Sequence, residues 1–303
     1  MGEFLVPVLN QIGMLFIIAA VGLLLRKMNV LTDPAIKGIN GAIVNVTWPA
    51  MALMAMLVDY TPEVLSGFLT VMVISIFAMS FSCLVGYLFF RKHKDKLRRP
   101  VLISLASLPN AGFIGMPIAY ALYGDLGVLY MAAFLVGFNL LVWTAGASMF
   151  TGFGLKTLKG LVSPGFIGIV IGLVIFLLKI KLPAAVESAI VNLGQLNTPL
   201  AMMMLGARMD TLKLSDLADK QMWGATALKL VIIPLMLYGA MRLLGFEGIL
   251  LAMPVMMTAM PAASACQILS ERYEADNALT AKGISLSTLM CSVTVPLLAL
   301  LMG

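Results

Sequence analysis

The segment Ser107–Pro117 reads SLPNAGFIGMP, and it decides what kind of fold this sequence can adopt. It contains two prolines, two glycines and one asparagine within an otherwise apolar stretch. Proline removes a helical hydrogen-bond donor and clashes with the preceding turn. Inside lipid, the freed backbone groups are tolerated only where protein or water lines them. The segment therefore predicts an interrupted membrane helix, with a kinked packing helix as the alternative interpretation.

The composition of the whole chain also indicates a membrane protein. Of its 303 residues, 61% are hydrophobic and only 11% are charged, and the mean hydropathy is +1.03. Soluble domains average about 45–50% apolar and about 25% charged residues. So few charges exclude an ordinary cytosolic enzyme and a disordered chain. No basic residue precedes Arg26, so we expect the first apolar stretch to be a retained helix and not a cleaved signal peptide.

Apolar runs separated by charges or turn residues predict ten spans. Sixteen of the 20 Lys and Arg residues fall in connections after odd-numbered spans, and three fall in connections after even-numbered spans. Because cytoplasmic loops hold the Lys and Arg excess, we expect both termini outside. The basic run Arg91–Arg99 is then a cytoplasmic loop near anionic lipid and not a nucleic-acid site. The expected spans are 6–26, 39–58, 67–90, 101–122, 127–150, 163–180, 187–206, 222–244, 248–270 and 279–301.

The two halves of the sequence resemble each other. NVTWPAMALM (Asn45–Met54) aligns with QLNTPLAMMM (Gln195–Met204), which superimposes Pro49 on Pro199. Five spans per half is an odd number, so the second half must enter the membrane inverted, as in many secondary transporters. The alternative is chance similarity of two apolar strings. We therefore predict an all-α membrane protein of about ten transmembrane helices, in two inverted five-helix repeats (1–155 and 156–303) with crossed, broken helices 4 and 9.

The counterpart of the first broken segment is MPVMMTAMPAASACQ (Met253–Gln267) in the ninth span. Two broken helices in equivalent positions would cross at the membrane midplane. Their half-helix N-termini would then direct positive dipole ends and free N–H groups at one point, which favours an anion. The residues expected to shape this crossing are Pro109, Asn110, Gly112, Gly115, Pro117, Pro261 and, at the related breaks, Pro49 and Pro199. Ser264 and Gln267 are expected to line it.

LPNAGFIGMP (Leu108–Pro117) resembles a motif of the auxin efflux carrier family, which includes plant auxin exporters and bacterial permeases for malate and similar organic acids. The likeness extends over nearly the whole chain, through FNLLVWT (Phe138–Thr144) and STL (Ser287–Leu289). That family is similar in fold to the bile acid/sodium symporters. The resemblance implies a scaffold of spans 1, 2, 6 and 7, a moving transport domain of spans 3–5 and 8–10, and a homodimer through the scaffold. It also implies that Asn110 helps hold a substrate carboxylate and that Asn139 contributes from the fifth span.

Other intramembrane polar residues have two interpretations each. Lys229 is the one ionisable residue well inside an expected span. It either extends toward the interface or supplies a cation at the crossing, and we include it among the substrate-binding candidates. A second set either bridges helices or contacts ligand: Asn45, Thr47, Gln195, Asn197 and Thr198. The GxxxG pattern of Gly168–Gly172 indicates close helix packing within the chain more than a dimer face.

These features predict a secondary transporter of small organic anions, mono- or dicarboxylates, that works by elevator-type alternating access. A sodium-coupled organic-anion symporter of the bile acid type is the alternative. We expect the substrate acid and the lipid bilayer as partners, no nucleic acid, and a plasma or bacterial inner membrane location. Cys83, Cys266 and Cys291 lack metal-site spacing, so no metal or cofactor is expected. Ser264 with Lys229 is the one conceivable catalytic pair, and nothing in the sequence fixes their geometry, so we expect no enzymatic activity. A channel would show a continuous polar stripe along one helix, whereas the polar residues here cluster at the helix breaks.

Overall fold

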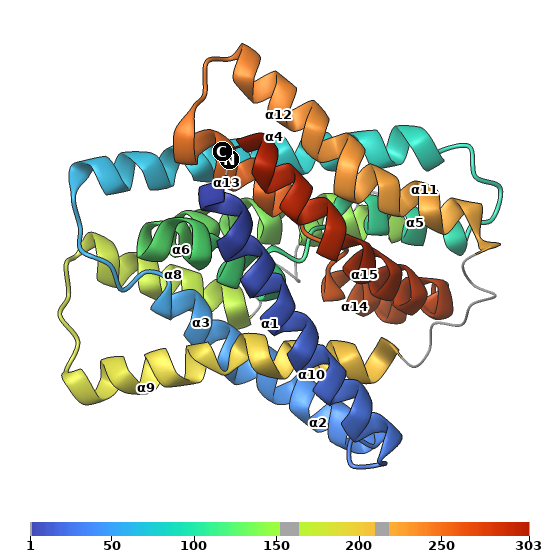
Figure 1. Cartoon of the computed structure of the whole chain (residues 1–303), viewed down its shortest axis with the longest axis horizontal. Coiled ribbons are helices and arrows are strands. Elements are labelled where there is room, and N and C mark those ends of the chain that lie inside the picture. The colour runs from blue at the N-terminus through green and yellow to red at the C-terminus, as the bar shows by residue number, and fades with distance from the viewer. Residues whose placement is uncertain (1, 152–163, 210–217, 303) are drawn as a thin grey trace.

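The computed structural model describes residues 2–151, 164–209 and 218–302, whose secondary structure is helical (Figure 1). Several helices contain a short π-helical segment, labelled η. The first group of elements is α1 (Gly2–Lys27), α2 (Asp33–Ala42), η1 (Ile43–Thr47), α3 (Trp48–Met54), α4 (Pro62–Phe90), α5 (Arg98–Ser107), η2 (Ala111–Gly115), α6 (Met116–Leu141), η3 (Val142–Gly146) and α7 (Ala147–Thr151). The second group is α8 (Pro164–Leu177), α9 (Ala184–Gln195), α10 (Asn197–Arg208), α11 (Lys220–Ala227), η7 (Leu228–Ile232), α12 (Ile233–Leu243), α13 (Gly248–Thr258), α14 (Ser264–Arg272) and α15 (Asn277–Met302).

Five helical stretches of the described residues are long and apolar enough to cross a membrane, as expected of an integral membrane protein. They are Leu5–Lys27, Pro62–Phe90, Ala111–Thr151, Lys220–Leu243 and Asn277–Met302. The third has 41 residues, and a straight helix of that length would measure roughly 60 Å, about twice the hydrocarbon thickness. Gly124 divides it, with φ 58° and ψ −144°, a conformation that glycine adopts without a Cβ clash. This turn lies between the two expected spans 101–122 and 127–150.

The other expected spans correspond to shorter or interrupted helices. The span expected at 39–58 corresponds to α2, η1 and α3 in succession, and the one at 187–206 corresponds to α9 and α10, which join at Leu196. The span expected at 248–270 is divided into α13 and α14. The expected boundary between the halves, at 155/156, lies outside the described residues. The ten-span topology and the inverted repeat therefore stay predictions.

Two sets of helices are distinguished by their packing partners. In one set α1 packs on α10, and α3 packs on α8 and α9. In the other, α4 packs on α5 and α6, and α13 packs on α4, α6 and α12. Helix α1 also packs on α6 and α15, so it contacts both sets. Gly168 and Gly172 of α8 lie so close to Pro49 and Met56 of the α3 region that a Cβ would overlap them. The prediction that this GxxxG pattern packs within the chain is confirmed.

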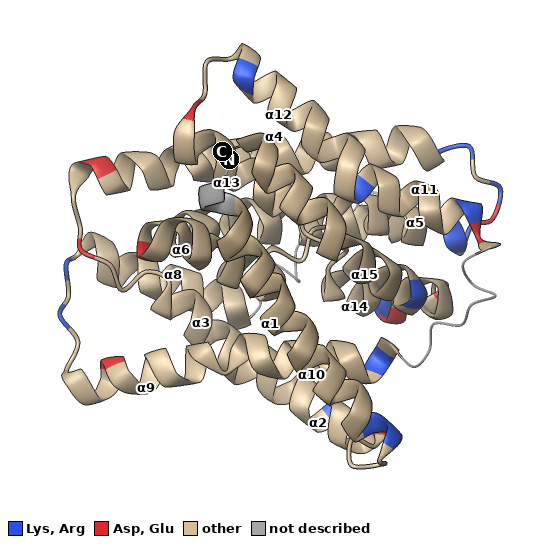
Figure 2. Cartoon of the chain, in the orientation of Figure 1, with Lys and Arg blue, Asp and Glu red and all other residues tan. Residues whose placement is uncertain are grey.

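Charged residues are distributed unevenly over the molecule. Figure 2 shows Lys and Arg gathered at one end, around the α4–α5 connection, the start of α11, and the ends of α1, α10 and α14. Few lie at the opposite end, whereas Asp and Glu are found at both ends. The connections after odd-numbered spans, which contain most Lys and Arg residues, are therefore separated in space from the connections after even-numbered spans.

Candidate functional site

The two broken helices contact each other through their extended segments. The chain is extended between α5 and η2 and again between α13 and α14. The Asn110 N–H donates to the Pro261 carbonyl at 2.7 Å, and the Ala263 N–H donates to the Leu108 carbonyl at 2.9 Å. These paired bonds form a short antiparallel bridge, so the two breaks lie directly against each other.

The prolines occupy positions in this bridge where no amide donor is required. Pro109 lies opposite Ala262 in the antiparallel pair, and proline has no N–H to leave unsatisfied. The Ala262 N–H donates to the hydroxyl of Ser287 on α15 at 3.1 Å. Ser287 is buried, with 1% of its surface exposed. The amide donors of the central bridge residues therefore have partners, which buried backbone groups require.

The crossing has two chemically opposite faces. Helices η2 and α14 begin at Ala111 and Ser264, so their N-terminal N–H groups lie on one face. Helices α5 and α13 end at Ser107 and Thr258, so their last carbonyls lie on the other. We call the first the cavity face and the second the rear face. Helix N-termini attract anions and helix C-termini attract cations, so the two faces have opposite preferences.

A cavity of about 660 Å³ adjoins the cavity face, within the usual size range of small-molecule sites. One side of its lining comes from α1, α2, η1, α3, α8 and α10, and the other from the crossing, α6, η3, α14 and α15. The cavity therefore lies between the two sets of helices distinguished by their packing. Four of the expected substrate-binding residues line it: Asn110, Asn139, Ser264 and Gln267. Pro109 and Gly112 also line it.

Asn110 connects the crossing to the cavity. Its Oδ1 accepts a hydrogen bond from the Phe113 N–H at 3.3 Å and so caps η2. Because Oδ1 is engaged in this bond, the amide Nδ2 is the donor left for a ligand. The side chain lines the cavity although only 5% of the residue is exposed. A deeply set amide donor of this kind suits a carboxylate oxygen.

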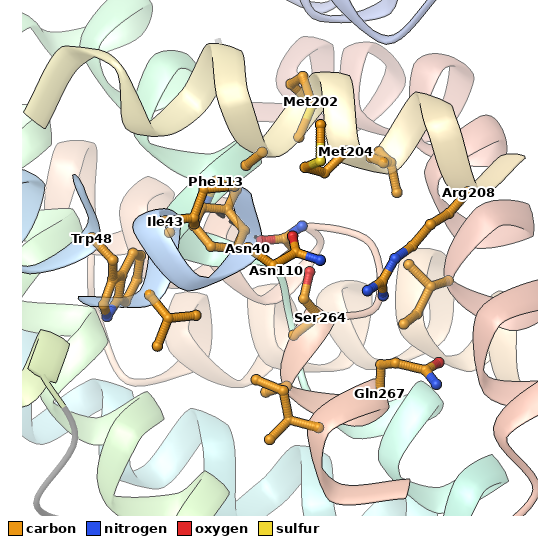
Figure 3. A pocket seen from close by; sticks show the side chains of 18 of the residues that line it. Asn40, Ile43, Trp48, Asn110, Phe113, Met202, Met204, Arg208, Ser264 and Gln267 are labelled. Atoms are coloured by element: carbon orange, nitrogen blue, oxygen red, sulfur yellow. Dashed lines mark hydrogen bonds between the residues drawn. The ribbon is translucent and has the colours of Figure 1, made fainter. Parts of the chain in front are cut away.

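The start of α14 provides a second group of donors. Its N-cap residue, Ala263, makes no side-chain capping bond, and Ser264 and Ala265 at the start of the helix line the cavity. Figure 3 shows the guanidinium of Arg208, from the last turn of α10, pointing toward Asn110 and Ser264. An amide, an uncapped helix N-terminus and a guanidinium thus border the same space. All three favour an anion.

Gln267 and Asn139 are also buried, and each makes a hydrogen bond within the chain. The Gln267 Nε2 donates to Glu271 at 2.9 Å, whereas its buried Oε1 has no partner among the described residues. The Asn139 Nδ2 donates to the Leu135 carbonyl of its own helix at 2.8 Å. Each amide therefore already has one intramolecular bond, and each retains hydrogen-bonding capacity toward the cavity.

The end of the cavity away from Arg208 is aromatic. Trp48 and Phe113 lie edge to face there, with ring centroids 5.3 Å apart. A Cβ on Gly112 or on Gly165 would overlap the Trp48 indole. The tryptophan on α3 is thus wedged between the crossing segment η2 and α8. The cavity combines one polar end with one apolar end, and its lining also includes Asp33 and Glu271.

Lys229, which we included among the substrate-binding candidates, is not part of the cavity lining. It lies in η7, is fully buried, and contacts the rear face of the crossing. Its Nζ donates to the Thr258 carbonyl at 2.7 Å and to the Ser107 carbonyl at 3.5 Å. Those two residues are the last of α13 and α5. The physical reason is that the carbonyl ends of two helices attract the ammonium away from the cavity.

Several expected helix breaks are not interruptions of the chain. Pro117 lies in the first turn of α6, directly after η2, where proline is tolerated. Pro49 is the second residue of α3 and follows η1 without a gap, and Pro199 lies in the first turn of α10. Gly115 packs against Met257 and does not line the cavity. Pro261 lies at the crossing but not on the cavity surface.

Two of the five polar residues in the two similar segments bridge helices. The Thr47 hydroxyl donates to Asn197 Oδ1 at 2.9 Å, and Asn197 Nδ2 contacts the Met51 sulfur at 3.1 Å. Asn45 bonds the Gly41 carbonyl of its own helix. These three residues, with Gln195 and Thr198, are absent from the cavity lining. Thr47 and Asn197 therefore form a bridge between two helices.

The π-helical segments coincide with the functional region of the described chain. Residues of η1, η2 and η3 line the cavity, and η7 contains Lys229. A π-turn shifts the register of the helix that follows, and such turns are frequent at functional sites. The side chains that follow a π-turn therefore lie on a different side of the helix than they would in a regular α-helix.

Sequence reasoning missed three residues that the structure places at the site. Arg208 counted as a loop charge, although its position one helix turn after the MMML run of the repeat could have indicated it. Trp48 was part of the NVTWPA motif without a role. Ser287 was part of the STL motif, also without a role. The partners of these residues come from distant segments, which the linear sequence does not reveal.

Comparison with known proteins places the chain among transporters. A family model described as membrane transport protein matches residues 7–159 and 153–299. An uncharacterized transporter of Methanothermobacter thermautotrophicus is 25% identical over 291 residues, covering 93% of this chain and 94% of the relative. An uncharacterized transporter of Methanocaldococcus jannaschii is 22% identical over 296 residues, covering 92% of this chain and 94% of the relative.

Proposed function

The chain belongs to the membrane transport protein family, and on that premise we propose that it is a secondary transporter of small organic anions. One observation supports the anion class above all others. Asn110 Nδ2, the uncapped start of α14 and the Arg208 guanidinium border one cavity at the crossing. A carboxylate bound there would receive hydrogen bonds from the amide and the helix end, together with the charge of the guanidinium.

The two ends of the cavity suggest how the substrate is oriented. The carboxylate would lie against Asn110 and Ser264, and the carbon skeleton would extend toward Trp48 and Phe113. We propose mono- or dicarboxylates, with Asn139 and Gln267 contacting the remaining polar groups. Arg26 and Lys37 also line the cavity, and Arg26 is paired with Asp33 at 2.7 Å. A second carboxylate would find the positive charge of Lys37 in the lining.

An elevator-type mechanism is supported by the position of the cavity between two packing sets. The set containing α1, α3, α8 and α10 would be the scaffold, and the set containing the crossing would move past it. The chain would cross the membrane ten times with both termini outside, in a plasma or bacterial inner membrane. Trp48 of the scaffold touches the crossing at Gly112, so this contact would change during each cycle.

One hydrogen bond supports the inverted repeat that the mechanism requires. Thr47 and Asn197 are equivalent in the aligned segments, 150 residues apart, and they bond each other. A pseudo-twofold axis that relates the two segments would bring these equivalent residues together.

A thermal-shift screen of the purified protein against mono- and dicarboxylates tests the proposal. A ligand at 100 times its Kd adds about 2.7 kcal/mol of stability. Asn110→Asp keeps the oxygen that caps η2 but replaces the amide donor with a negative charge, so it should abolish the shift. The control is Asn277→Asp at the exposed start of α15, which should keep the full shift. A folded wild-type protein that responds to no acid would overturn the organic-anion assignment.

The same screen separates the sodium-coupled alternative. Repeating it in sodium and choline chloride at equal ionic strength shows whether the carboxylate shift needs sodium. We expect equal shifts in both salts. A shift that occurs in sodium alone would favour the symporter, and vesicle uptake driven by a sodium gradient would establish it.

A further inference from the structure

An acidic residue lines the cavity on the side that carries the proposed anion donors. Among the described residues of the lining, four charged side chains come from α1, α2 and α10: Arg26, Asp33, Lys37 and Arg208. The fifth, Glu271, comes from α14. Glu271 therefore belongs to the helix whose N-terminus would bind the substrate carboxylate, and the organic-anion proposal gives it no role.

No ion pair within the described ranges neutralises Glu271. The other acid of the lining, Asp33, is paired with Arg26 at 2.7 Å. Glu271 Oε1 instead accepts a hydrogen bond from Gln267 Nε2 at 2.9 Å. Because this amide is neutral, it orients the carboxylate of Glu271 but leaves its negative charge in place.

The donor end of α14 and this acid lie on one face of the helix. Ser264, Gln267 and Glu271 have the spacing i, i+3 and i+7, which places side chains on one side of a helix, and all three line the cavity (Figure 3). Seven residues correspond to about 10 Å along the axis. The proposed function places the remaining polar groups of the substrate near Gln267, between the two ends of this row. Such a group would therefore lie close to Glu271.

From this arrangement we infer that Glu271, held by Gln267, makes the cavity selective for organic acids with a single negative charge. The inference rests on the proposed function, because it presumes that a carboxylate binds at Ser264. An ionised carboxyl group only accepts hydrogen bonds. It would therefore repel a second carboxylate on the substrate, whereas a hydroxyl or amide group at the same position could donate to it.

Lys37 has the opposite effect on a second carboxylate but a different position in the fold. It lies on α2, which packs on α10 in the other set of helices. Ser264 and Glu271 lie on one helix, so their separation is the same in every position of the proposed moving part. The repulsion from Glu271 would therefore accompany the substrate through the cycle, whereas Lys37 would act only where the two sets meet around the cavity.

Pairs of acids that differ only in the second polar group test this inference. Succinate is compared with succinamate, and glutarate with glutaramate, so an uncharged amide replaces one carboxylate. The Kd of each acid is obtained from the dependence of Tm on its concentration, at about pH 7.5, where carboxyl groups are ionised. We expect wild type to bind the monoamide about four- to fifteenfold more tightly, as for two unit charges roughly 5 Å apart at an effective dielectric constant of about 40–80.

Glu271→Gln keeps an oxygen that can accept the Gln267 hydrogen bond but removes the charge. The variant should lose the preference within each pair by binding the dicarboxylate more tightly, while the Kd of the monoamide stays near the wild-type value. Glu274→Gln, at an exposed position in the turn after α14 and outside the lining, is the matched control and should keep the wild-type preference. An unchanged preference in Glu271→Gln would overturn the inference.

The wild-type result separates this inference from the proposed function. Wild type that binds the acids but discriminates within neither pair, or that prefers the dicarboxylates, would overturn the selectivity of Glu271 and leave the organic-anion proposal intact. Folded wild type that responds to none of these acids, nor to any acid of the wider screen, would overturn both.

Discussion

The cavity face and the rear face of the crossing are made by the same two broken helices, yet they handle polarity in opposite ways. On the cavity face, the α14 N-terminus has no side-chain cap, and Asn110 keeps an amide donor for a ligand. On the rear face, the carbonyl ends of α5 and α13 are bonded by Lys229. Hydrogen-bond donors without an intramolecular partner thus lie on the cavity face, whereas the carbonyl groups on the rear face are hydrogen-bonded by Lys229.

This contrast predicts which substitutions affect binding and which affect stability. Groups on the cavity face would bind the ligand, so removing one should lower the ligand affinity more than the stability of the fold. Groups on the rear face form hydrogen bonds with the backbone carbonyls, so removing one should lower the stability of the fold. A substitution that reverses this division would show that the faces are not functionally distinct.

After Asn110→Asp, the largest effect is expected for Arg208→Gln on the cavity side. A hydrogen bond to a charged group contributes about 1.5–3 kcal/mol, so carboxylate affinity should fall about ten- to a hundredfold. The measurement is the dependence of Tm on ligand concentration, fitted to the linkage relation to give Kd for each variant and referred to the variant's own Tm. Arg272→Gln, at an exposed arginine outside the cavity lining, is the matched control. Equal affinity in both variants would remove Arg208 from the site.

The sequence predicts a part of the crossing only where that part produces a local pattern in the chain. Prolines and an asparagine inside apolar stretches are local signals, and they located both segments that meet at the crossing. The direction of Lys229 is not local. The lysine is drawn to carbonyls of Ser107 and Thr258, which belong to two other helices, and the sequence alone left its role undecided.

Arg208 illustrates the opposite failure. A basic residue at a helix end is normally solvated, and the charge tally treated it as a loop charge. Its guanidinium enters the cavity because α10 packs beside the crossing, a tertiary arrangement that no single segment encodes. Pro49 and Pro199 show that proline in an apolar run does not always open the helix, since each lies in the first turn of a helix that continues.

A smaller effect is expected where α15 supports the bridge. Ser287→Ala removes the acceptor of the Ala262 N–H, and a buried donor left unsatisfied costs about 1–3 kcal/mol. The apparent Tm should fall, while the carboxylate affinity stays near the wild-type value. Ser292→Ala is the control, because that hydroxyl bonds only the Leu289 carbonyl of its own helix. A Tm equal to that of Ser292→Ala would mean that the hydroxyl does not support the break.

The smallest effect is expected at the end of the rear-face helices, outside the membrane-spanning segments. Arg98 at the start of α5 forms an ion pair with Asp219, which precedes α11, and its Nε lies 3.8 Å from Asp276 before α15. Asp219 Oδ1 also caps α11 through the amides of Gln221 and Met222. These contacts join the ends of three helices that surround the rear face.

Asp219→Asn separates the charge from the cap, because asparagine caps a helix as well as aspartate does. Burial raises the pKa of the Asp219 carboxyl, but the hydrogen bonds from Arg98 and Met222 outweigh it and hold the pKa below its ordinary 3.8. A carboxyl with a depressed folded pKa adds stability above its unfolded pKa and loses it as pH falls through the folded value. At pH 7 the variant should therefore be less stable by at most about 1 kcal/mol, as for a partly exposed ion pair. The difference in stability should disappear as the pH falls below 3.8. The control, Asp125→Asn at an exposed position, should match wild type at every pH. A difference that persists in acid would assign the effect to packing and not to the ion pair.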